Sequence, residues 1–110
     1  MEGMELICFE LICNVGDARS SFIQAIGEAK NGNFQEAEKL IEAGEISFAK
    51  GHKVHGNLIQ KEASGEHTDV SLLLVHAEDQ LMSAEAFKIL CTEFIDLYKS
   101  IKQICKSNAS

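Results

Sequence analysis

The sequence predicts an all-α protein, an antiparallel three-helix bundle, and three observations lead to this fold class. The 110 residues include no proline, no tryptophan and one tyrosine, and a chain rich in Ala, Leu, Ile, Glu and Lys favours helices over a multi-stranded sheet. Two polar, glycine-containing segments, 31–33 and 63–68, divide the chain into three parts. Within each part the apolar residues recur at steps of three and four, which is the period of an amphipathic helix.

The first helix is expected over residues 4–31. Gly32 follows it and suits the left-handed conformation that commonly ends a helix. The apolar residues of this segment form one stripe, which predicts a single buried face: Cys8, Leu11, Ile12, Val15, Ala18, Phe22, Ala25, Ile26 and Ala29.

The second helix is expected over residues 33–63. Asn33 and Glu36 have the spacing of a capping box, with Asn in place of Ser or Thr. Gly44 and Gly51 lie seven residues apart on its apolar stripe. Each glycine costs a helix up to about 1 kcal/mol relative to Ala, so we expect a neighbouring helix to approach closely at both.

The third helix is the longest and is expected over residues 68–106, with Thr68 as N-cap and Asp69 as an acid in the first turn. Its apolar residues occupy two stripes. The first suits the core of the chain: Val70, Leu73, Leu74, Ala77, Leu81, Ala84, Phe87, Cys91, Phe94, Ile95, Tyr98 and Ile101. The second surrounds Asp79 and has no place inside a three-helix monomer: Leu72, Val75, Met82, Ala86 and Ile89. Because exposed apolar stripes mark interfaces, we expect a homo-oligomer packed through the third helix.

Size and charge exclude several classes of protein. A chain of 12.1 kDa is expected to form a single domain over residues 1–110. The net charge of −7 and the scattered basic residues leave no groove for nucleic acid. No apolar run approaches the roughly 20 residues that span a bilayer, and the acidic start has no basic leader segment, so a cytoplasmic location without membrane insertion is expected. The four cysteines form no C-x-x-C pair and are expected to be reduced.

Asp79 is a candidate metal ligand. An isolated carboxylate is costly to bury ionised in an apolar interface. Around a symmetry axis its copies would either share protons or recruit a cation, and oxygen ligands favour Mg²⁺ or Ca²⁺. The alternative is that Asp79 lies at the edge of the stripe and is solvated.

His76 is a candidate nucleophile, three residues before Asp79 on a neighbouring part of the helix surface. A neutral imidazole is nucleophilic near pH 7, although a lone histidine is more often structural. His52 and His55 share a face of the second helix without a partner at ligand spacing, and His67 lies in a loop or cap. No Glu stands three residues before a histidine, so the E-x-x-H ligands of di-iron bundles are missing.

The segment 70–83, VSLLLVHAEDQLMS, resembles the active-site helix of the lactose/cellobiose-type enzyme IIA of the bacterial phosphoenolpyruvate-dependent sugar phosphotransferase system. The segments CNVGDARS at 13–20, NGNF at 31–34 and EASG at 62–65 extend the resemblance to essentially the whole chain. It implies a homotrimer of three-helix subunits, with a phosphorylated histidine at His76. It also implies that Asp79 of three subunits shares one divalent cation, Mg²⁺, on the threefold axis.

The resemblance further implies a phosphoryl relay. Nε2 of His76 would accept the group from the phosphohistidine of HPr and pass it to a cysteine of the cognate IIB, while the membrane protein IIC recognises the sugar. A phosphoryl group adds about −1.5 to −2 charges, so we expect the neighbouring Glu78 and Asp79 to disfavour the phosphorylated state and help onward transfer. Docking should be transient and slower at high salt, since this acidic chain suits basic or mixed partner surfaces.

Two other functions would fit a helical oligomer. One is a non-catalytic adaptor that uses the second stripe for assembly, and the other is a metal-storing bundle, for which ligands beyond Asp79 are missing. Lactose, cellobiose and chitobiose remain open as the sugar. The context of Cys13 and of residues 75–77 favours cellobiose-type β-glucosides.

Overall fold

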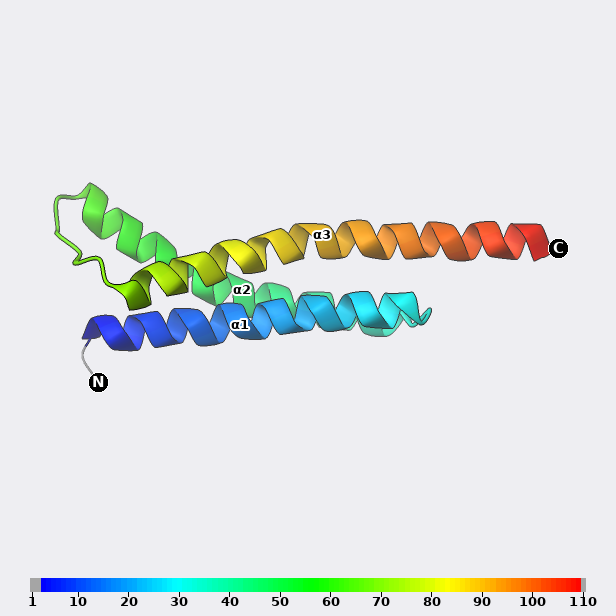
Figure 1. Cartoon of the computed structure of the whole chain (residues 1–110), viewed down its shortest axis with the longest axis horizontal. Coiled ribbons are helices and arrows are strands. Elements are labelled where there is room, and N and C mark those ends of the chain that lie inside the picture. The colour runs from blue at the N-terminus through cyan, green and yellow to red at the C-terminus, as the bar shows by residue number, and fades with distance from the viewer. Residues whose placement is uncertain (1–2, 110) are drawn as a thin grey trace.

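The computed structural model describes residues 3–109 and confirms the all-helical class. Its elements are α1 (Gly3–Lys30), α2 (Phe34–Ala63) and α3 (Leu72–Ala109), which form an elongated bundle of 64 × 25 × 20 Å (Figure 1). No helix in this part of the chain is long and apolar enough to cross a membrane.

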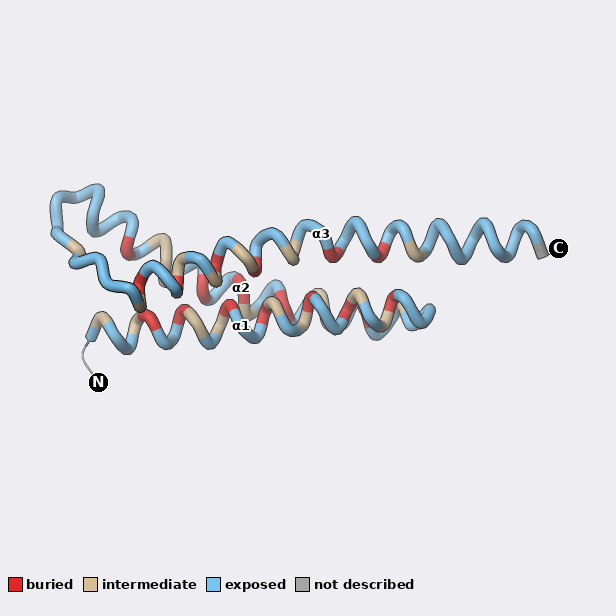
Figure 2. Tube along the Cα trace, viewed as in Figure 1, coloured by how far each residue is buried: buried red, intermediate tan, exposed pale blue. Residues whose placement is uncertain are grey.

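α1 is the central helix of the bundle. It packs against both α2 and α3, whereas α2 and α3 contact each other much less, and the end of α2 turns away beside the loop that leads to α3 (Figure 1). Ile12 and Ile26 of the predicted α1 stripe are only partly buried, while its other seven residues are buried in the middle of the core (Figure 2). They are Cys8, Leu11, Val15, Ala18, Phe22, Ala25 and Ala29.

The turn between α1 and α2 confirms one expectation and corrects another. Gly32 is left-handed, with φ +83°, as a helix-ending glycine should be. The capping box is wrong, because Asn33 makes no side-chain cap hydrogen bond. Its Nδ2 instead donates to Oε2 of Glu28 at 2.8 Å, and Glu36 pairs with Lys39 at 3.3 Å.

The two glycines of α2 mark the closest approach of α1, as predicted. A Cβ atom at Gly44 would lie 2.6 Å from Cε1 of Phe22, and one at Gly51 would lie 2.7 Å from Cγ1 of Val15. Both distances are far below van der Waals contact. The absence of a side chain at these positions therefore sets the distance between α1 and α2.

α3 begins later than predicted, at Leu72, and Thr68 does not cap it. The hydroxyl oxygen of Ser71 accepts from the backbone N–H of Leu74 at 3.1 Å, which is the N-cap hydrogen bond. Asp69 lies before the helix and pairs with Nε2 of His67 at 2.8 Å. Asp69 is thus engaged with His67 before the helix begins, and Ser71 is the residue that caps α3.

The far end of α3 extends to Ala109, beyond the predicted residue 106, and projects past the turn between α1 and α2 (Figures 1 and 2). The first apolar stripe forms the core as expected from Leu74 to Ile95. Three of its members are exposed instead: Val70, Phe94 and Ile101. Val70 precedes the helix, and Ile101 lies at the level of the α1–α2 turn, where little of the bundle is left to cover it.

Candidate functional site

The second stripe of α3 is exposed to solvent, as predicted. We call it the open face of α3, and it consists of Leu72, Val75, Asp79, Met82, Ala86 and Ile89. Leu72 is 86% exposed and Met82 is 69% exposed. Large apolar side chains in a row at such exposure mark an interaction surface.

A groove of about 510 Å³ lies beside the open face, between the end of α2 and the start of α3. Its walls are mainly apolar and include Leu58, Ile59, Val75 and Met82, and the Asp79 side chain also lines it. The carboxylate of Asp79 is therefore accessible to solvent although its surroundings are apolar. If a partner covered it, its negative charge would have to be balanced by a cation or removed by protonation.

His76 is exposed on the same helix. At about 100° per residue it lies about 60° around the helix axis from Asp79, and it is outside the groove that Asp79 lines. The imidazole can thus be reached by a partner that approaches α3 from the flank facing α1. The structure brings His76 and Asp79 to adjoining parts of one surface.

Glu78 does not accompany His76, contrary to the expectation from sequence. Its side chain lies about 160° around the axis from His76 and faces α2, where Oε2 is 2.5 Å from Nδ1 of His55. Both side chains are 28% exposed. The two atoms are close enough for a salt bridge when the imidazole is protonated. Their geometry is not that of a hydrogen bond, since Nδ1 of His55 has no hydrogen-bond partner. His55 therefore has an acidic partner that spacing along the sequence could not reveal.

The other histidines and the cysteines have no role in this site. His52 is exposed, with its ring 5.9 Å from that of Phe48, and His67 pairs with Asp69 in the loop. The cysteines are free, as expected, with Cys8 and Cys91 buried and Cys13 and Cys105 exposed. Burial raises the pKa of both buried thiols, and Glu78 and Glu5 add smaller contributions at Cys8.

One polar contact near His76 was not predicted from the sequence. Nη1 of Arg19 in α1 donates to Oε1 of Gln80 in α3 at 3.4 Å, and the guanidinium lies over the ring of Phe87, 5.2 Å from its centroid. Arg19 is part of the segment 13–20 that carried the family resemblance. Sequence periodicity gave no signal for it, because a polar contact between helices leaves no trace in an apolar stripe.

A single chain offers no complete metal centre within residues 3–109, where no group of three or more His, Cys, Asp or Glu side chains could hold an ion. Asp79 supplies one carboxylate. The donor chemistry fits a hard divalent cation only when several copies contribute, because such ions take six or more oxygen ligands. A metal-storing bundle within one chain has no support in this part of the molecule.

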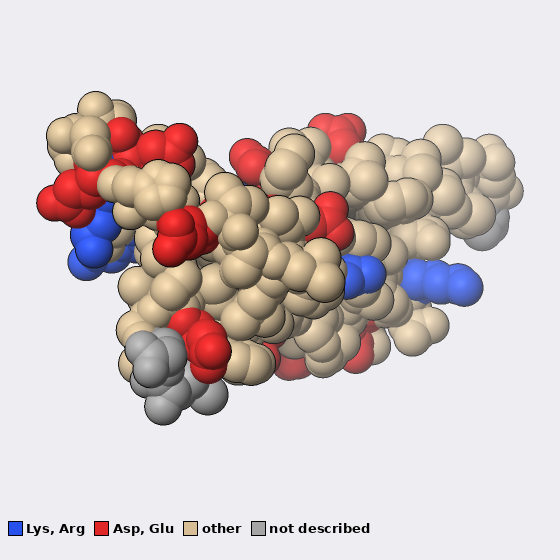
Figure 3. Space-filling model, turned by 60° about the vertical axis from the view of Figure 1, so that its left-hand side comes forward, with Lys and Arg blue, Asp and Glu red and all other residues tan. Residues whose placement is uncertain are grey.

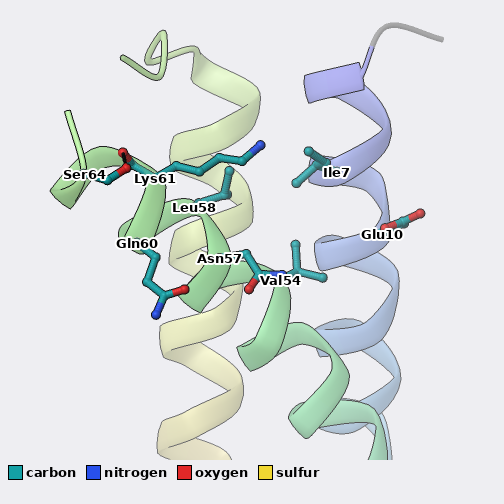
Figure 4. Close-up of a pocket in the computed structure, with 8 residues that line it drawn as sticks. All are labelled: Ile7, Glu10, Val54, Asn57, Leu58, Gln60, Lys61 and Ser64. Carbon is teal, nitrogen blue, oxygen red and sulfur yellow. Dashed lines mark hydrogen bonds between the residues drawn. The ribbon is translucent and has the colours of Figure 1, made fainter. Parts of the chain in front are cut away.

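A cavity of about 720 Å³ lies away from both candidate residues. Figure 4 shows it between the start of α1, which provides Ile7 and Glu10, and the end of α2, which with the adjoining Ser64 provides the other labelled side chains. No residue of α3 lines it. The cavity follows from the divergence of α2 at this end of the bundle and has no contact with His76.

Acidic side chains are spread over the end of the molecule that carries the loop between α2 and α3 (Figure 3). Lys and Arg gather in only a few places on this view. The partner surfaces that match this end are therefore basic or mixed in charge.

The three-helix bundle, with a histidine and a carboxylate exposed on its third helix, is compatible with the class of protein that the family comparison identifies. Residues 6–99 match the model of the family described as "PTS system, Lactose/Cellobiose specific IIA subunit". The chain belongs to this family and is an enzyme IIA component of the phosphotransferase system. This membership replaces the alternative of a non-catalytic adaptor.

Individual relatives cover nearly the whole chain. The lichenan-specific phosphotransferase enzyme IIA component of Bacillus subtilis is 42% identical over 102 residues, 93% of each chain. The oligo-beta-mannoside-specific EIIA component of the same organism is 46% identical over 96 residues, 87% of each chain.

Solved structures confirm the three-helix fold. The cellobiose-specific enzyme IIA of Bacillus anthracis superposes with a TM-score of 0.91 at 43% identity and 94% coverage of both chains. The IIA(chitobiose)–HPr complex of Escherichia coli gives a TM-score of 0.79 at 34% identity, covering 93% of this chain and 99% of the other.

Proposed function

We propose that this protein is a cytoplasmic phosphocarrier in which Nε2 of His76 accepts a phosphoryl group from phospho-HPr and passes it to the cysteine of a cognate IIB, which works with a membrane IIC. The observation that carries the proposal is the exposure of His76 on α3, the helix that contains most of the segment 70–83 that carries the family resemblance. A chitobiose-specific relative solved in complex with HPr supports the donor.

The chemistry requires an exposed neutral imidazole. The lone pair of Nε2 attacks the phosphorus of the donor phosphohistidine, a new P–N bond forms, and the donor's P–N bond breaks with its electron pair returning to the donor ring. In the second step the IIB thiolate forms an S–P bond, and the P–N bond on His76 breaks in the same manner. Neither step needs an oxidant, a reductant or water, so an exposed site that partners cover in turn is sufficient.

The surroundings of His76 fit a group that is held and then released. Asp79 is the acidic neighbour about 60° away, while Glu78 is turned to α2 and paired with His55. The start of α3 at Leu72 places His76 in the second helical turn, closer to the positive end of the helix than a start at Thr68 would. The repulsion of a phosphoryl group is therefore weaker than the two neighbouring acids in the sequence suggested.

The open face of α3 supports assembly into a homotrimer. Three copies packed through it would bring three Asp79 carboxylates to the axis, where one Mg²⁺ would be held by their oxygens. The ion would supply the positive charge that lets three like charges lie together. The exposed apolar side chains around Asp79 supply the buried area.

The sugar is proposed to be a β-linked disaccharide of the cellobiose class. Relatives are named for lichenan, oligo-β-mannosides and cellobiose, and lactose-specific proteins are 36–38% identical.

Intact-mass analysis tests the carrier role. The native chain is incubated with phosphoenolpyruvate, enzyme I and HPr beside His76→Ala and the control His67→Ala, which removes an exposed loop histidine. We expect one acid-labile phosphoryl group on the native chain and on His67→Ala, and none on His76→Ala. An unmodified native chain in the presence of phospho-HPr would refute the proposed carrier role of His76.

A further inference from the structure

Gln80 lies next to the proposed phosphorylation site. It follows His76 by four residues on α3, which places the two side chains about 40° apart around the axis and one turn apart along it. Helical side chains lean toward the N-terminus of their helix. The half-buried Gln80 side chain therefore extends back toward the turn that carries His76.

The contact with Arg19 determines which way the Gln80 amide faces. A guanidinium has five donors and no acceptor, so the group that faces Nη1 of Arg19 at 3.4 Å must be the carbonyl oxygen Oε1. The amide nitrogen with its two hydrogens then points away from Arg19. Arg19 thus leaves the two N–H groups of the Gln80 amide to an acceptor other than itself, and His76 lies one turn away on the same helix.

Arg19 also brings an uncompensated positive charge between α1 and α3. Within residues 3–109 no Asp or Glu forms an ion pair with it, its Nε is buried without a hydrogen-bond partner, and the ring of Phe87 fixes the guanidinium from one side. Arg19 as a whole is half-buried, and a partly desolvated cation without a carboxylate partner would be stabilised by a dianionic group beside it.

We propose that Arg19 and Gln80 position and stabilise the phosphoryl group on His76. The amide N–H of Gln80 donates to a phosphoryl oxygen, while Arg19 holds the amide in the required orientation and contributes positive charge. Gln80 contacts the transferred group directly, whereas Arg19 is a positioning residue that acts through Gln80, and the P–N bond itself forms and breaks at Nε2 of His76 as described above. The inference rests on the proposed carrier function and names the residues that determine the stability of the phosphoryl group on His76.

The expected effect is on the phosphoryl equilibrium with HPr. A hydrogen bond to a charged group has a strength that corresponds to about a tenfold change in an equilibrium constant. Gln80→Met keeps the length of the side chain and removes the donor, and should shift the equilibrium toward phospho-HPr by about tenfold. Gln80→Glu keeps a partner for Arg19, removes the donor and adds a negative charge, and should shift it further.

Phe87→Leu is the matched control, since it removes the ring under Arg19 and leaves the contact with Gln80. The ratio of phosphorylated chain to phospho-HPr is measured by intact mass at equilibrium, together with the hydrolysis rate of the isolated phosphorylated chain and the helical circular dichroism of each variant. We expect the Phe87→Leu ratio to stay within about twofold of the native one, because a ring–cation contact at this distance acts on Arg19 and not on the phosphoryl group.

The outcomes separate the inference from the function on which it rests. A native chain that takes no phosphoryl group refutes the carrier function. If the native chain is phosphorylated, and the folded Gln80→Glu and Gln80→Met variants have the same phosphoryl equilibrium with HPr and the same hydrolysis rate, the role of Arg19 and Gln80 is refuted while the carrier function stands. Faster hydrolysis and an equilibrium shifted toward HPr in both Gln80 variants, with Phe87→Leu unchanged, support it.

Discussion

Replacing Gly51 by Ala tests whether the distance between α1 and α2 depends on a missing side chain. The new methyl carbon would lie 2.7 Å from Cγ1 of Val15, where carbon atoms need about 3.5–4.0 Å. Val15 is fully buried, and a β-branched side chain in a helix has one strongly preferred rotamer, so it cannot turn aside. Overpacking of this kind costs about 1–3 kcal/mol, and the gain in helix propensity recovers up to about 1 kcal/mol.

With the full gain in helix propensity, the net effect of Gly51→Ala is a loss of up to about 2 kcal/mol in the free energy of unfolding. Gly56 in the same helix is the matched control, because nothing lies within 4 Å of a Cβ built there. Gly56→Ala should stabilise by up to about 1 kcal/mol. Urea unfolding followed by helical circular dichroism, at equal protein concentration because assembly adds to stability, measures both. A Gly51→Ala protein as stable as Gly56→Ala would refute the close-approach argument.

Three further predictions concern the metal, the partners and the buried thiols. Asp79→Leu should abolish binding of the proposed divalent cation and leave the proposed trimer intact, as measured by metal analysis and light scattering; unchanged metal content would exclude Asp79 as a metal ligand. Phosphoryl transfer from HPr should slow as salt is raised, because screening weakens the attraction of this acidic chain for basic partner surfaces; a rate independent of salt would contradict that steering. Burial raises the pKa of Cys91 above its ordinary value of 9.0, so its contribution to stability is complete below about pH 9 and is lost as the pH rises toward the folded pKa. Unfolding in urea at about pH 8 and about pH 10 should therefore show a larger loss for the native chain than for Cys91→Ala, and equal losses would argue against it.

The fold was predictable because each helix has a continuous apolar stripe and each break contains a glycine. The helix starts were less predictable. Asn33 and Thr68 are residue types that commonly cap helices. The side-chain amide of Asn33 donates to Glu28 instead, and α3 begins after Ser71, which provides its N-cap hydrogen bond. Local hydrogen bonds of this kind compete with capping and depend on which acceptor lies nearest in space.

Exposure of His76 and Asp79 on α3 followed from their helical spacing, whereas their polar neighbours did not. Glu78 is adjacent to both in the chain and yet faces α2, because 100° per residue separates consecutive side chains widely. Arg19 is far from His76 in the chain and yet meets its helical neighbour Gln80. Polar contacts between helices depend on how α1 and α3 are rotated about their axes relative to each other. A single sequence does not reveal that rotation closely enough to pair individual side chains.

The central place of α1 also determines how the native bundle opens. Local openings expose the backbone where few buried contacts hold it, so amide hydrogens in the middle of α1, shielded from both sides, should exchange with solvent most slowly. The end of α2 diverges from the bundle (Figure 1) and can separate without disturbing the packing of α1 on α3. Since that end forms one wall of the groove beside Asp79, the width of the groove can fluctuate while the helix that carries His76 stays in place.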